Sequence, residues 1–223
     1  MNEKQMVGEK AAEFVKDGMV VGLGTGSTVF YTIQKLGELV RQGLSIKGIP
    51  TSKATEVLAK KVGIPLTTFG EIEKIDLAID GADEVDRHLN LIKGGGGALV
   101  REKIIAHAAE TFIIVADSTK LTDDLGGFAL PVEIVPFGCE ITIRHIRRLG
   151  CQPQLRQTNG KAFVSDNGNY IVDCPFPAIL RPDVLEQSLN MIPGVVENGL
   201  FVQMADAVVS VDQGKNVIIK ERP

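Results

Sequence analysis

The sequence predicts an α/β protein, built from a mostly parallel sheet domain with helices on both faces and a smaller inserted α+β domain. Three observations lead to this prediction. Short apolar runs alternate with helical patterns over about the first 130 residues, the order of elements changes near residue 130, and two strand-like runs follow residue 204. Alternating strands and helices are typical of βαβ units, whose strands pair in parallel.

The first part of the chain predicts a Rossmann-like domain. Apolar residues recur at 4-3-4 spacing from Val29 to Val40, which places them on one face of a helix. Either Thr51 or Ser52 can cap the next helix. We expect strands at 19–23, 45–49, 75–80 and 111–116, and helices at 4–16, 29–40, 51–61 and 98–109. Right-handed crossovers bring the carboxyl ends of such strands, where ligands gather, to one edge of the sheet.

The second part predicts a smaller domain with ferredoxin-like order. Asn167-Gly168 is a strong hairpin signal between two strand-like runs, and Pro182 can begin a helix that ends at Asn190. We expect a strand at 131–136, a helix at 138–149, strands at 161–166 and 169–174, a helix at 182–190 and an extended segment at 195–202. This is the split βαβ order. The predicted domains are therefore 130–204 and, with tail strands at 206–211 and 216–220, 1–129 plus 205–223.

Composition and charge exclude several functional classes. The 223 residues carry a net charge of −4 and contain no basic tract, so nucleic acid is not an expected partner. No apolar stretch approaches ~18 residues and the N-terminus lacks a signal layout, so we expect no membrane segment. Three cysteines without a CxxC pattern are expected to be free thiols of a cytoplasmic protein. Three histidines far apart in sequence give little support for a metal site.

Glycine is the unusual component, at 24 of 223 residues. The average share of glycine in proteins is about 7%. Three glycines lie within 22–26, one is Gly81 and four lie at 94–97, so eight of the 24 fall in three short segments. Clustered glycines are typical of loops in which the backbone must approach a ligand closely.

The segment GLGTGSTV, 22–29, follows a predicted strand and begins a predicted helix. Its glycines allow a tight turn, and the positive end of the helix favours an anion such as a phosphate monoester. A dinucleotide site fits less well, because the spacing is GxGxG and the next strand does not end with an acid for a ribose hydroxyl. A structural turn without a ligand remains open.

The segment DGADEVD, 80–86, ends another predicted strand with four acids in seven residues. Asp80 and Asp83 enclose Gly81 and Ala82, small residues that leave room for a ligand. An Asx-type turn with solvated acids is the plain alternative. A divalent metal site is a second alternative, but the segment lacks the alternating oxygen ligands of a calcium loop. Paired acids beside a sugar can bind hydroxyl groups and transfer a proton.

The segment KGGGGALVREK, 93–103, lies between a predicted strand and a predicted helix. Four consecutive glycines cost ordering entropy, which favours contact between the backbone and a ligand. A flexible linker is the alternative, but a linker has no purpose at this position. Lys93 offers a cation and Glu102 a carboxylate, although a surface helix position is the most frequent place for a glutamate.

Together these motifs resemble the type A ribose-5-phosphate isomerase family. The resemblance rests on GLGTGST, TSKAT at 51–55, DGADEVD, KGGGGAL followed by REK, and ADSTK at 116–120. It includes the predicted ferredoxin-like insert and covers essentially the whole chain. The family belongs to the non-oxidative branch of the pentose phosphate pathway and interconverts D-ribose 5-phosphate and D-ribulose 5-phosphate through an enediol-type intermediate. The resemblance thus implies a small sugar phosphate as substrate, no metal, no organic cofactor, and a homodimer or homotetramer.

The resemblance also implies roles for individual residues. Glu102 matches the general base that moves the proton between C2 and C1. Asp80, Asp83 and Lys93 match a polar cluster that opens the sugar ring and stabilises the developing oxyanion. The matched substrate-binding positions are Lys4, Thr25, Gly26, Ser27, Thr28, Asp80, Gly81, Ala82, Asp83, Lys93, Gly94, Gly95, Gly96 and Lys120. Residues Thr51 to Thr55 receive no role.

The chemistry of these residues agrees with proton abstraction next to a carbonyl. That reaction needs a base whose pKa lies near the working pH and donors directed at the oxygen that becomes negative. Three alternatives differ in testable ways. An amino-sugar-phosphate deaminase would release ammonia, and a sugar-phosphate sensor in a regulator would need a helix-turn-helix segment, for which the 21 residues before Gly22 leave little room. A nucleotide-dependent oxidoreductase would need the missing ribose-binding acid.

Overall fold

The computed structural model describes residues 2–222, and their contacts divide the chain into two compact units. Unit 1 comprises Met1–Ala82, Arg101–Leu121 and Met204–Pro223, and unit 2 comprises Asp83–Val100 and Thr122–Gln203. The compactness of a unit does not make it an independently folding domain. The sequence-based domains, 1–129 with 205–223 and 130–204, therefore stay a proposal, and their terminal residues 1 and 223 lie outside the described part.

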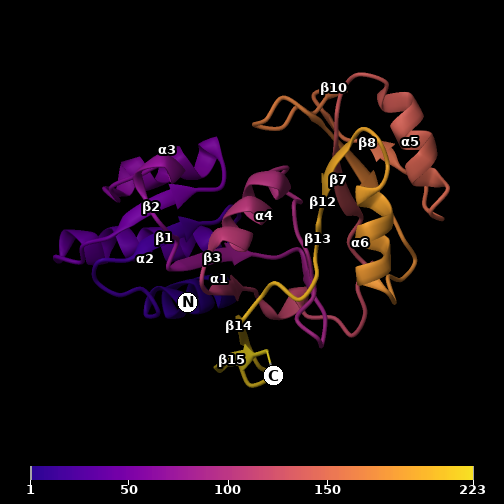
Figure 1. Cartoon of the computed structure of the whole chain (residues 1–223). Coiled ribbons are helices and arrows are strands. Elements are labelled where there is room, and N and C mark those ends of the chain that lie inside the picture. Colours follow the sequence, from indigo (N-terminus) through magenta and orange to yellow (C-terminus); the bar gives the residue numbers. More distant parts are fainter. Residues whose placement is uncertain (1, 223) are drawn as a thin grey trace. The chain divides into compact units, whose positions relative to one another are not determined.

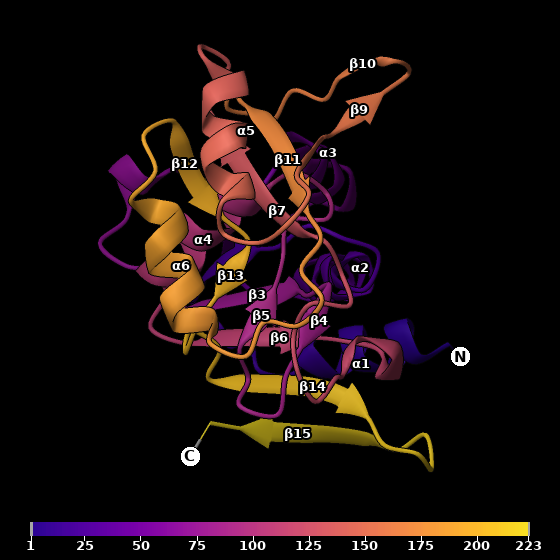
Figure 2. The ribbon, with the colours of Figure 1, turned by 90° about the vertical axis from the view of Figure 1, so that its right-hand side faces the viewer.

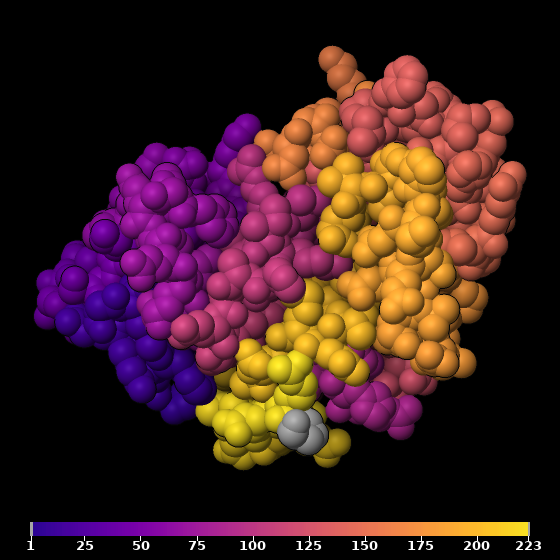
Figure 3. Space-filling view, in the orientation of Figure 1, coloured from indigo at the N-terminus to yellow at the C-terminus, as the bar shows by residue number. Residues whose placement is uncertain are grey.

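A six-stranded sheet forms the centre of unit 1, in the order β15-β14-β6-β3-β1-β2. Its strands are β1 (Val20–Leu23), β2 (Lys47–Pro50), β3 (Leu77–Gly81), β6 (Phe112–Val115), β14 (Ala207–Val211) and β15 (Val217–Glu221). All neighbours pair in parallel except β14 and β15, which run in opposite directions (Figure 2). The mostly parallel sheet is confirmed, as is the pairing of the two tail strands with it. The edge strand β15 is visible in yellow at the surface in Figure 3.

Helices cover both faces of this sheet. On one face lie α1 (Glu3–Ala12), α2 (Val29–Arg41) and α3 (Lys53–Val62), whose apolar residues share a core with Leu77 and Ile79 of β3. Helices α1 and α2 pack against each other (Figure 1). On the opposite face lies α4 (Leu99–Ala108), since a Cβ at Gly22 of β1 would be 2.4 Å from Ile105 Cγ2. Ser52 caps α3, as one of the two predicted capping residues, by accepting a hydrogen bond from Thr55 N.

Unit 2 contains an antiparallel sheet in the order β12-β7-β11-β8. Its strands are β7 (Leu130–Ile134), β8 (Gln154–Leu155), β11 (Tyr170–Cys174) and β12 (Val195–Asn198). Helices α5 (Cys139–Arg147) and α6 (Pro182–Asn190) share a core with Val132 of β7 and Val172 of β11. The strand order 4-1-3-2, with two helices on one face, is that of a ferredoxin-like unit.

One predicted strand of this unit is wrong. The second strand of the sheet is β8, not residues 161–166. Within 161–166, only β10 (Lys161–Ala162) pairs, with β9 (Gln157–Thr158), and Val164 forms a single bridge with Tyr170. The turn at Asn167-Gly168 does form, because Gly168 adopts a φ of +85° and Ser165 O accepts from Gly168 N. The turn at Asn167-Gly168 was therefore predicted correctly, but the strand before it was predicted too long.

A second antiparallel sheet of unit 2 was not predicted. Its order is β13-β5-β4, formed by Leu200–Phe201, Leu91–Ile92 and Glu84–Val85 respectively. Part of the acidic segment 80–86 is thus a strand and not a turn. The extended segment 195–202 divides between two sheets, β12 and β13. Two short 3₁₀ helices, Phe69–Glu71 and Ser118–Lys120, complete the elements. No helix of the described residues is long and apolar enough to span a bilayer.

Candidate active site

The strand order of unit 1 makes one edge of the sheet the candidate ligand site. From β1 the chain crosses to β2 on one side and then returns to place β3 on the other side of β1. Ligands of open α/β sheets bind at such a point, beyond the carboxyl ends of the strands. The residues that follow β1 and end β3 are the loop Gly24–Thr28 and Asp80-Gly81, which come from the first two glycine-containing motifs.

Asp80 and the loop after β1 are packed directly together. Asp80 is 1% exposed, and its Oδ1 accepts hydrogen bonds from Thr25 N at 3.0 Å and Gly81 N at 2.7 Å. A Cβ at Gly24 would lie 2.2 Å from this oxygen and 2.6 Å from Asp80 Cα, so residue 24 must be glycine. Gly26 has a φ of +134°, which side chains other than hydrogen rarely permit. The glycines of this loop therefore bring its backbone against the carboxylate.

A cluster of hydroxyl groups surrounds Thr25. Thr25 Oγ1 lies 2.7 Å from Thr51 Oγ1, 2.8 Å from Ser52 Oγ and 3.0 Å from Thr55 Oγ1. Thr55 Oγ1 also donates to Gly24 O at 2.8 Å. The segment TSKAT, which received no role above, thus supports the loop after β1. The available signal was its position after β2, at the same edge of the sheet.

Two predicted phosphate-binding residues lie side by side. Lys4 Nζ, from α1, donates to Ser27 Oγ at 2.9 Å. Thr28 is the N-cap residue of α2, and its side chain accepts no hydrogen bond from the first N–H groups of the helix. The Thr28 side chain therefore does not cap the positive end of α2. Lys120 follows β6 at the same edge, but its ammonium makes no hydrogen bond with this loop among residues 2–222. Lys4, Ser27 and Thr28 together offer a cation, hydroxyls and backbone N–H groups to an anion.

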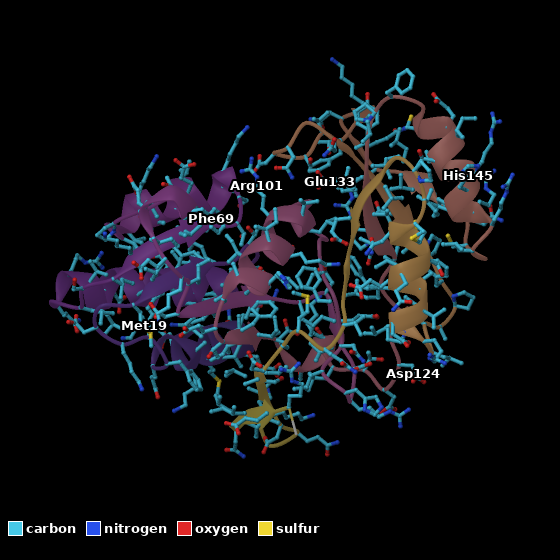
Figure 4. The ribbon with its side chains drawn as sticks, viewed as in Figure 1. Met19, Phe69, Arg101, Asp124, Glu133 and His145 are labelled. Atoms are coloured by element: carbon cyan, nitrogen blue, oxygen red, sulfur yellow. The ribbon has the colours of Figure 1, made fainter. Side chains whose placement is uncertain are left out.

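Glu102 is buried on the side of α4 that faces the sheet. It is 4% exposed and lies one turn before Ile105, the residue that packs over Gly22. The end of α4 lies near the start of β3, because Ala109 bridges Ile75, so the first turn of the helix lies toward the carboxyl edge. Figure 4 labels the neighbouring Arg101 on this turn. Along β3 the side chains of Ala78 and Asp80 point to one face of the sheet, and the side chain of Ile79 points to the other face.

The glycine run belongs to unit 2, where it forms a tight loop beside Asp83. Gly94 and Gly97 have φ values of +96° and +80°, and Gly97 N donates to Gly94 O at 2.9 Å. Gly95 N donates to Asp83 Oδ2 at 2.7 Å, and a Cβ at Gly95 would lie 2.6 Å from Asp83 Oδ1. Asp83 and the glycine run, predicted separately from two motifs, therefore contact each other.

Lys93 is a fully buried lysine. Its side chain is 1% exposed, its Nζ lies 5.4 Å from the centre of the Phe201 ring, and its backbone N donates to Gly199 O at 2.9 Å. A Cβ at Gly199 would be 2.3 Å from Lys93 O, so the chain approaches here as closely as glycine permits. Lysine is almost never fully buried unless its charge is paired. The role of Lys93 as a cation at the ligand site stays a prediction.

The remaining sequence expectations concern metal ions and thiols. Among the described residues, no group of three or more His, Cys, Asp and Glu side chains could hold a metal ion. Cys139, Cys151 and Cys174 are free and buried, as expected for unpaired thiols. Burial raises the pKa of the Cys139 thiol. These cysteines lie in the core of unit 2.

Comparison with known proteins adds independent information. Residues 47–215 match the family model described as ribose 5-phosphate isomerase A (phosphoriboisomerase A). The chain is 54% identical over 216 residues to ribose-5-phosphate isomerase A of Bacillus mycoides, covering 96% of this chain and 98% of that protein. It is 55% identical to the protein of the same name from Trichodesmium erythraeum, with 96% and 94% covered.

Solved structures show the same similarity. A D-ribose-5-phosphate isomerase in complex with phospho-erythronic acid is 42% identical, with a TM-score of 0.95 and both chains fully covered. Ribose 5-phosphate isomerase from Plasmodium falciparum is also 42% identical, with a TM-score of 0.94, covering 98% of this chain and 97% of that one. Family model, sequence identity and fold agree with the motifs, and the chain belongs to the ribose 5-phosphate isomerase A family.

Proposed function

We propose that this chain interconverts D-ribose 5-phosphate and D-ribulose 5-phosphate through an enediolate, with Glu102 as the general base. The isomerase activity follows from membership of the family. The roles of individual residues are our assignment. The observation that carries the role of Glu102 is its burial, at 4% exposure, on the side of α4 that faces the sheet.

The phosphate is bound by the loop after β1. Lys4 and Ser27 are in hydrogen-bond contact, and the start of α2 adds the positive end of a helix. We propose that Thr25 to Thr28 and Lys120 complete this anion site. A remote phosphate supplies binding energy that orients the reacting carbons. The relative solved with phospho-erythronic acid supports a sugar phosphate as the ligand class.

The proton transfer follows from the chemistry of an α-hydroxy carbonyl. The Glu102 carboxylate removes the C2 proton of the open-chain aldose, and the C–H electron pair forms the C1–C2 double bond. The C1 carbonyl pair moves to O1, which becomes an enediolate oxygen. Return of the proton to C1, with transfer of the O2 proton to O1, gives the ketose. No atom is gained or lost, so the reaction balances without a co-reactant, and the general base contributes about 10²–10⁴-fold.

Asp80, Asp83 and Lys93 assist before and during this transfer. Ring opening needs one group to accept the anomeric hydroxyl proton and another to donate a proton to the ring oxygen, and these three residues are our candidates. Lys93 and the backbone of the Gly94–Gly96 loop stabilise the negative oxygen of the enediolate, although Gly95 N–H already donates to Asp83. Donors that are already in place need no reorganisation when charge develops, which is why they lower the barrier.

The direct test is conversion of ribose 5-phosphate by the purified protein, followed by formation of the ketose. We expect turnover with ribose 5-phosphate and very poor turnover with unphosphorylated ribose. Equal kcat/KM values for the two sugars would overturn the phosphate site. An amino-sugar phosphate tests the deaminase alternative. Release of ammonia without isomerisation of ribose 5-phosphate would replace the proposed function.

Two further properties are part of this proposal. We place the enzyme in the cytoplasm, on the ground of its three free thiols. We also propose that it forms a homodimer or homotetramer, as its family implies. Light scattering of the purified protein tests the second property, and a single monomeric species at micromolar concentration would contradict it.

A further inference from the structure

Arg156, which no motif includes, binds the carbonyl side of the glycine loop. Its Nη1 donates to Gly94 O at 3.2 Å and to Gly95 O at 3.0 Å. These residues are 62 and 61 positions away in the sequence. The same guanidinium donates from Nε to Asp173 Oδ2 at 3.0 Å and from Nη2 to Asp173 Oδ1. One side chain therefore joins β11 to two successive carbonyls of the loop.

The surroundings of Arg156 hold it in one orientation. Its backbone N donates to Ile171 O and its O accepts from Phe163 N, both at 2.8 Å. Its guanidinium lies 5.7 Å from the centre of the Phe163 ring. The Arg156 side chain is only 15% exposed. A planar guanidinium with a bidentate carboxylate partner and an aromatic neighbour loses little entropy when it binds a third group.

Phe163 contacts the other end of the same loop. A Cβ at Gly97 would lie 2.5 Å from the ring atoms Cε1 and Cζ of Phe163. Beyond Phe163, the fully buried Glu133 of β7 accepts hydrogen bonds from Ser165 Oγ at 2.9 Å and Asn169 Nδ2 at 2.8 Å. Figure 4 labels Glu133. The segment that carries Arg156 and Phe163 is thus fixed at its far end by a buried carboxylate.

The hydrogen bonds of Arg156 determine where the loop's N–H groups point. In a trans peptide, the C=O of one residue and the N–H of the next point in opposite directions. The peptide between Gly94 and Gly95 is held on both sides, by Arg156 at its carbonyl and by Asp83 at its N–H. The peptide between Gly95 and Gly96 is held by Arg156 at its carbonyl only. Gly96 is exposed, and its N–H has no acceptor among residues 2–222.

We infer that Arg156 is a positioning residue of the isomerase, which keeps the Gly96 N–H directed outward as a ready donor to the enediolate oxygen. This inference rests on the proposed function. Arg156 acts through the peptide planes and does not touch the substrate. Asp173 and Phe163 are needed because they hold the guanidinium. The donor function of the glycine run then depends on Arg156, which lies between β8 and β9.

The test compares Arg156→Ala with wild type in steady-state kinetics. Loss of one oxyanion donor in other enzymes costs about 10²–10³-fold in kcat. Because the loop keeps its Asp83 contact, we expect kcat to fall by about 10- to 100-fold, with KM for ribose 5-phosphate nearly unchanged. Millimolar guanidinium should restore part of kcat. Arg181→Ala, which removes an exposed arginine paired with Asp183 in the same unit, is the matched control and should keep wild-type kcat.

Ligand affinity gives a second readout that a general loss of structure would not reproduce. Phospho-erythronic acid carries a carboxylate at the end remote from its phosphate, as a stable substitute for the enediolate. We expect Arg156→Ala to weaken its binding by about 10-fold and to leave inorganic phosphate binding unchanged. If Arg156→Ala does not fold, Asp173→Asn and Arg156→Gln decide the question on the same readouts.

The outcomes separate the two proposals. An active wild type with unchanged kcat and analogue affinity in Arg156→Ala overturns the positioning role alone. A fall in kcat/KM that comes only from KM overturns it as well. A wild type without isomerase activity overturns the proposed function, and the positioning role with it. A lower kcat, restored by guanidinium, with weaker analogue binding supports the inference.

Discussion

The carboxylate of Asp80 fills the space that a side chain at residue 24 would need. A Cβ at Gly24 would lie 2.2 Å from Asp80 Oδ1, an oxygen that already accepts the N–H of Thr25 at 3.0 Å. The loop that carries Ser27 and Thr28 is thereby placed by a residue of the proposed catalytic cluster. The proposed phosphate-binding loop and the acid group are consequently linked through one glycine.

Gly24→Ala should therefore impair catalysis strongly. The added methyl group must displace either Asp80 or the loop, and a misplacement of about 1 Å can cost on the order of 10²-fold in rate. We expect kcat/KM for ribose 5-phosphate to fall by at least ~10-fold. Gly70→Ala is the control, since its nearest neighbour would be Thr68 Oγ1 at 4.0 Å. Equal activity of wild type and Gly24→Ala would contradict the close approach.

Lys4→Met should weaken substrate binding rather than turnover. Its ammonium contacts Ser27 at 2.9 Å, and a charge-assisted hydrogen bond to a phosphate contributes about 1.5–3 kcal/mol. We expect KM for ribose 5-phosphate to rise by about 10-fold, with kcat nearly unchanged. Lys10→Met, on the same helix but paired with Glu13 at the surface, should leave both constants unchanged. An unaltered KM in Lys4→Met would remove Lys4 from the phosphate site.

Much of the fold could be predicted because its signals are local. Buried apolar runs define the strands of the six-stranded sheet, and Pro182 and Ser52 mark helix starts as they do in peptides. Strand β8 and the β4, β5 and β13 sheet could not be predicted, because two-residue strands carry no periodicity. Their pairing is determined by tertiary contacts.

The residues of the candidate site also divide into those that the sequence predicts and those that it does not. Gly24, Asp80 and Asp83 could be found because they lie in dense motifs whose composition costs stability without a ligand. Residues that act through long-range contacts could not be found. Arg156 reaches Gly95 from 61 residues away, and nothing in its own neighbourhood marks it. The hydroxyl cluster around Thr25 likewise forms only when β1 and β2 pair.

Asp76 should make stability depend on pH. The Val20 N–H donates to its carboxylate at 2.8 Å and, with Lys74, holds the pKa of Asp76 below its ordinary value. Because the pKa is lowered in the folded state, this stabilisation is present above the unfolded pKa and is lost as the pH falls through the folded pKa.

Asp76→Asn should therefore lower the free energy of unfolding by about 1 kcal/mol at pH 7. Urea titrations of wild type and variant at pH 7 and at pH 3 check this. We expect the difference to narrow at the lower pH. Glu13→Gln, which breaks an exposed pair, serves as control and should change stability by less than about 0.5 kcal/mol. A difference that stays constant with pH would refute the role of the Asp76 charge.

Treatment with a chelator should leave activity intact. The described residues contain no group of side chains suited to a metal ion, and the proposed proton transfer needs only a carboxylate, a lysine and backbone donors. Dialysis against EDTA followed by the isomerase assay checks this expectation. Inactivation that only added metal ions reverse would show that the mechanism lacks a component.

Glu102→Gln tests whether the buried carboxylate of Glu102 moves the proton. The amide keeps the shape of the side chain but cannot accept the C2 proton. In deuterated water, wild type should incorporate deuterium from the solvent into the sugar, and Glu102→Gln should lose this exchange. We also expect Glu102→Gln to lower kcat by at least ~10²-fold, with little change in KM. Glu110→Gln, beyond the end of the same helix and exposed, should behave as wild type. Near wild-type turnover and exchange in Glu102→Gln would contradict the account.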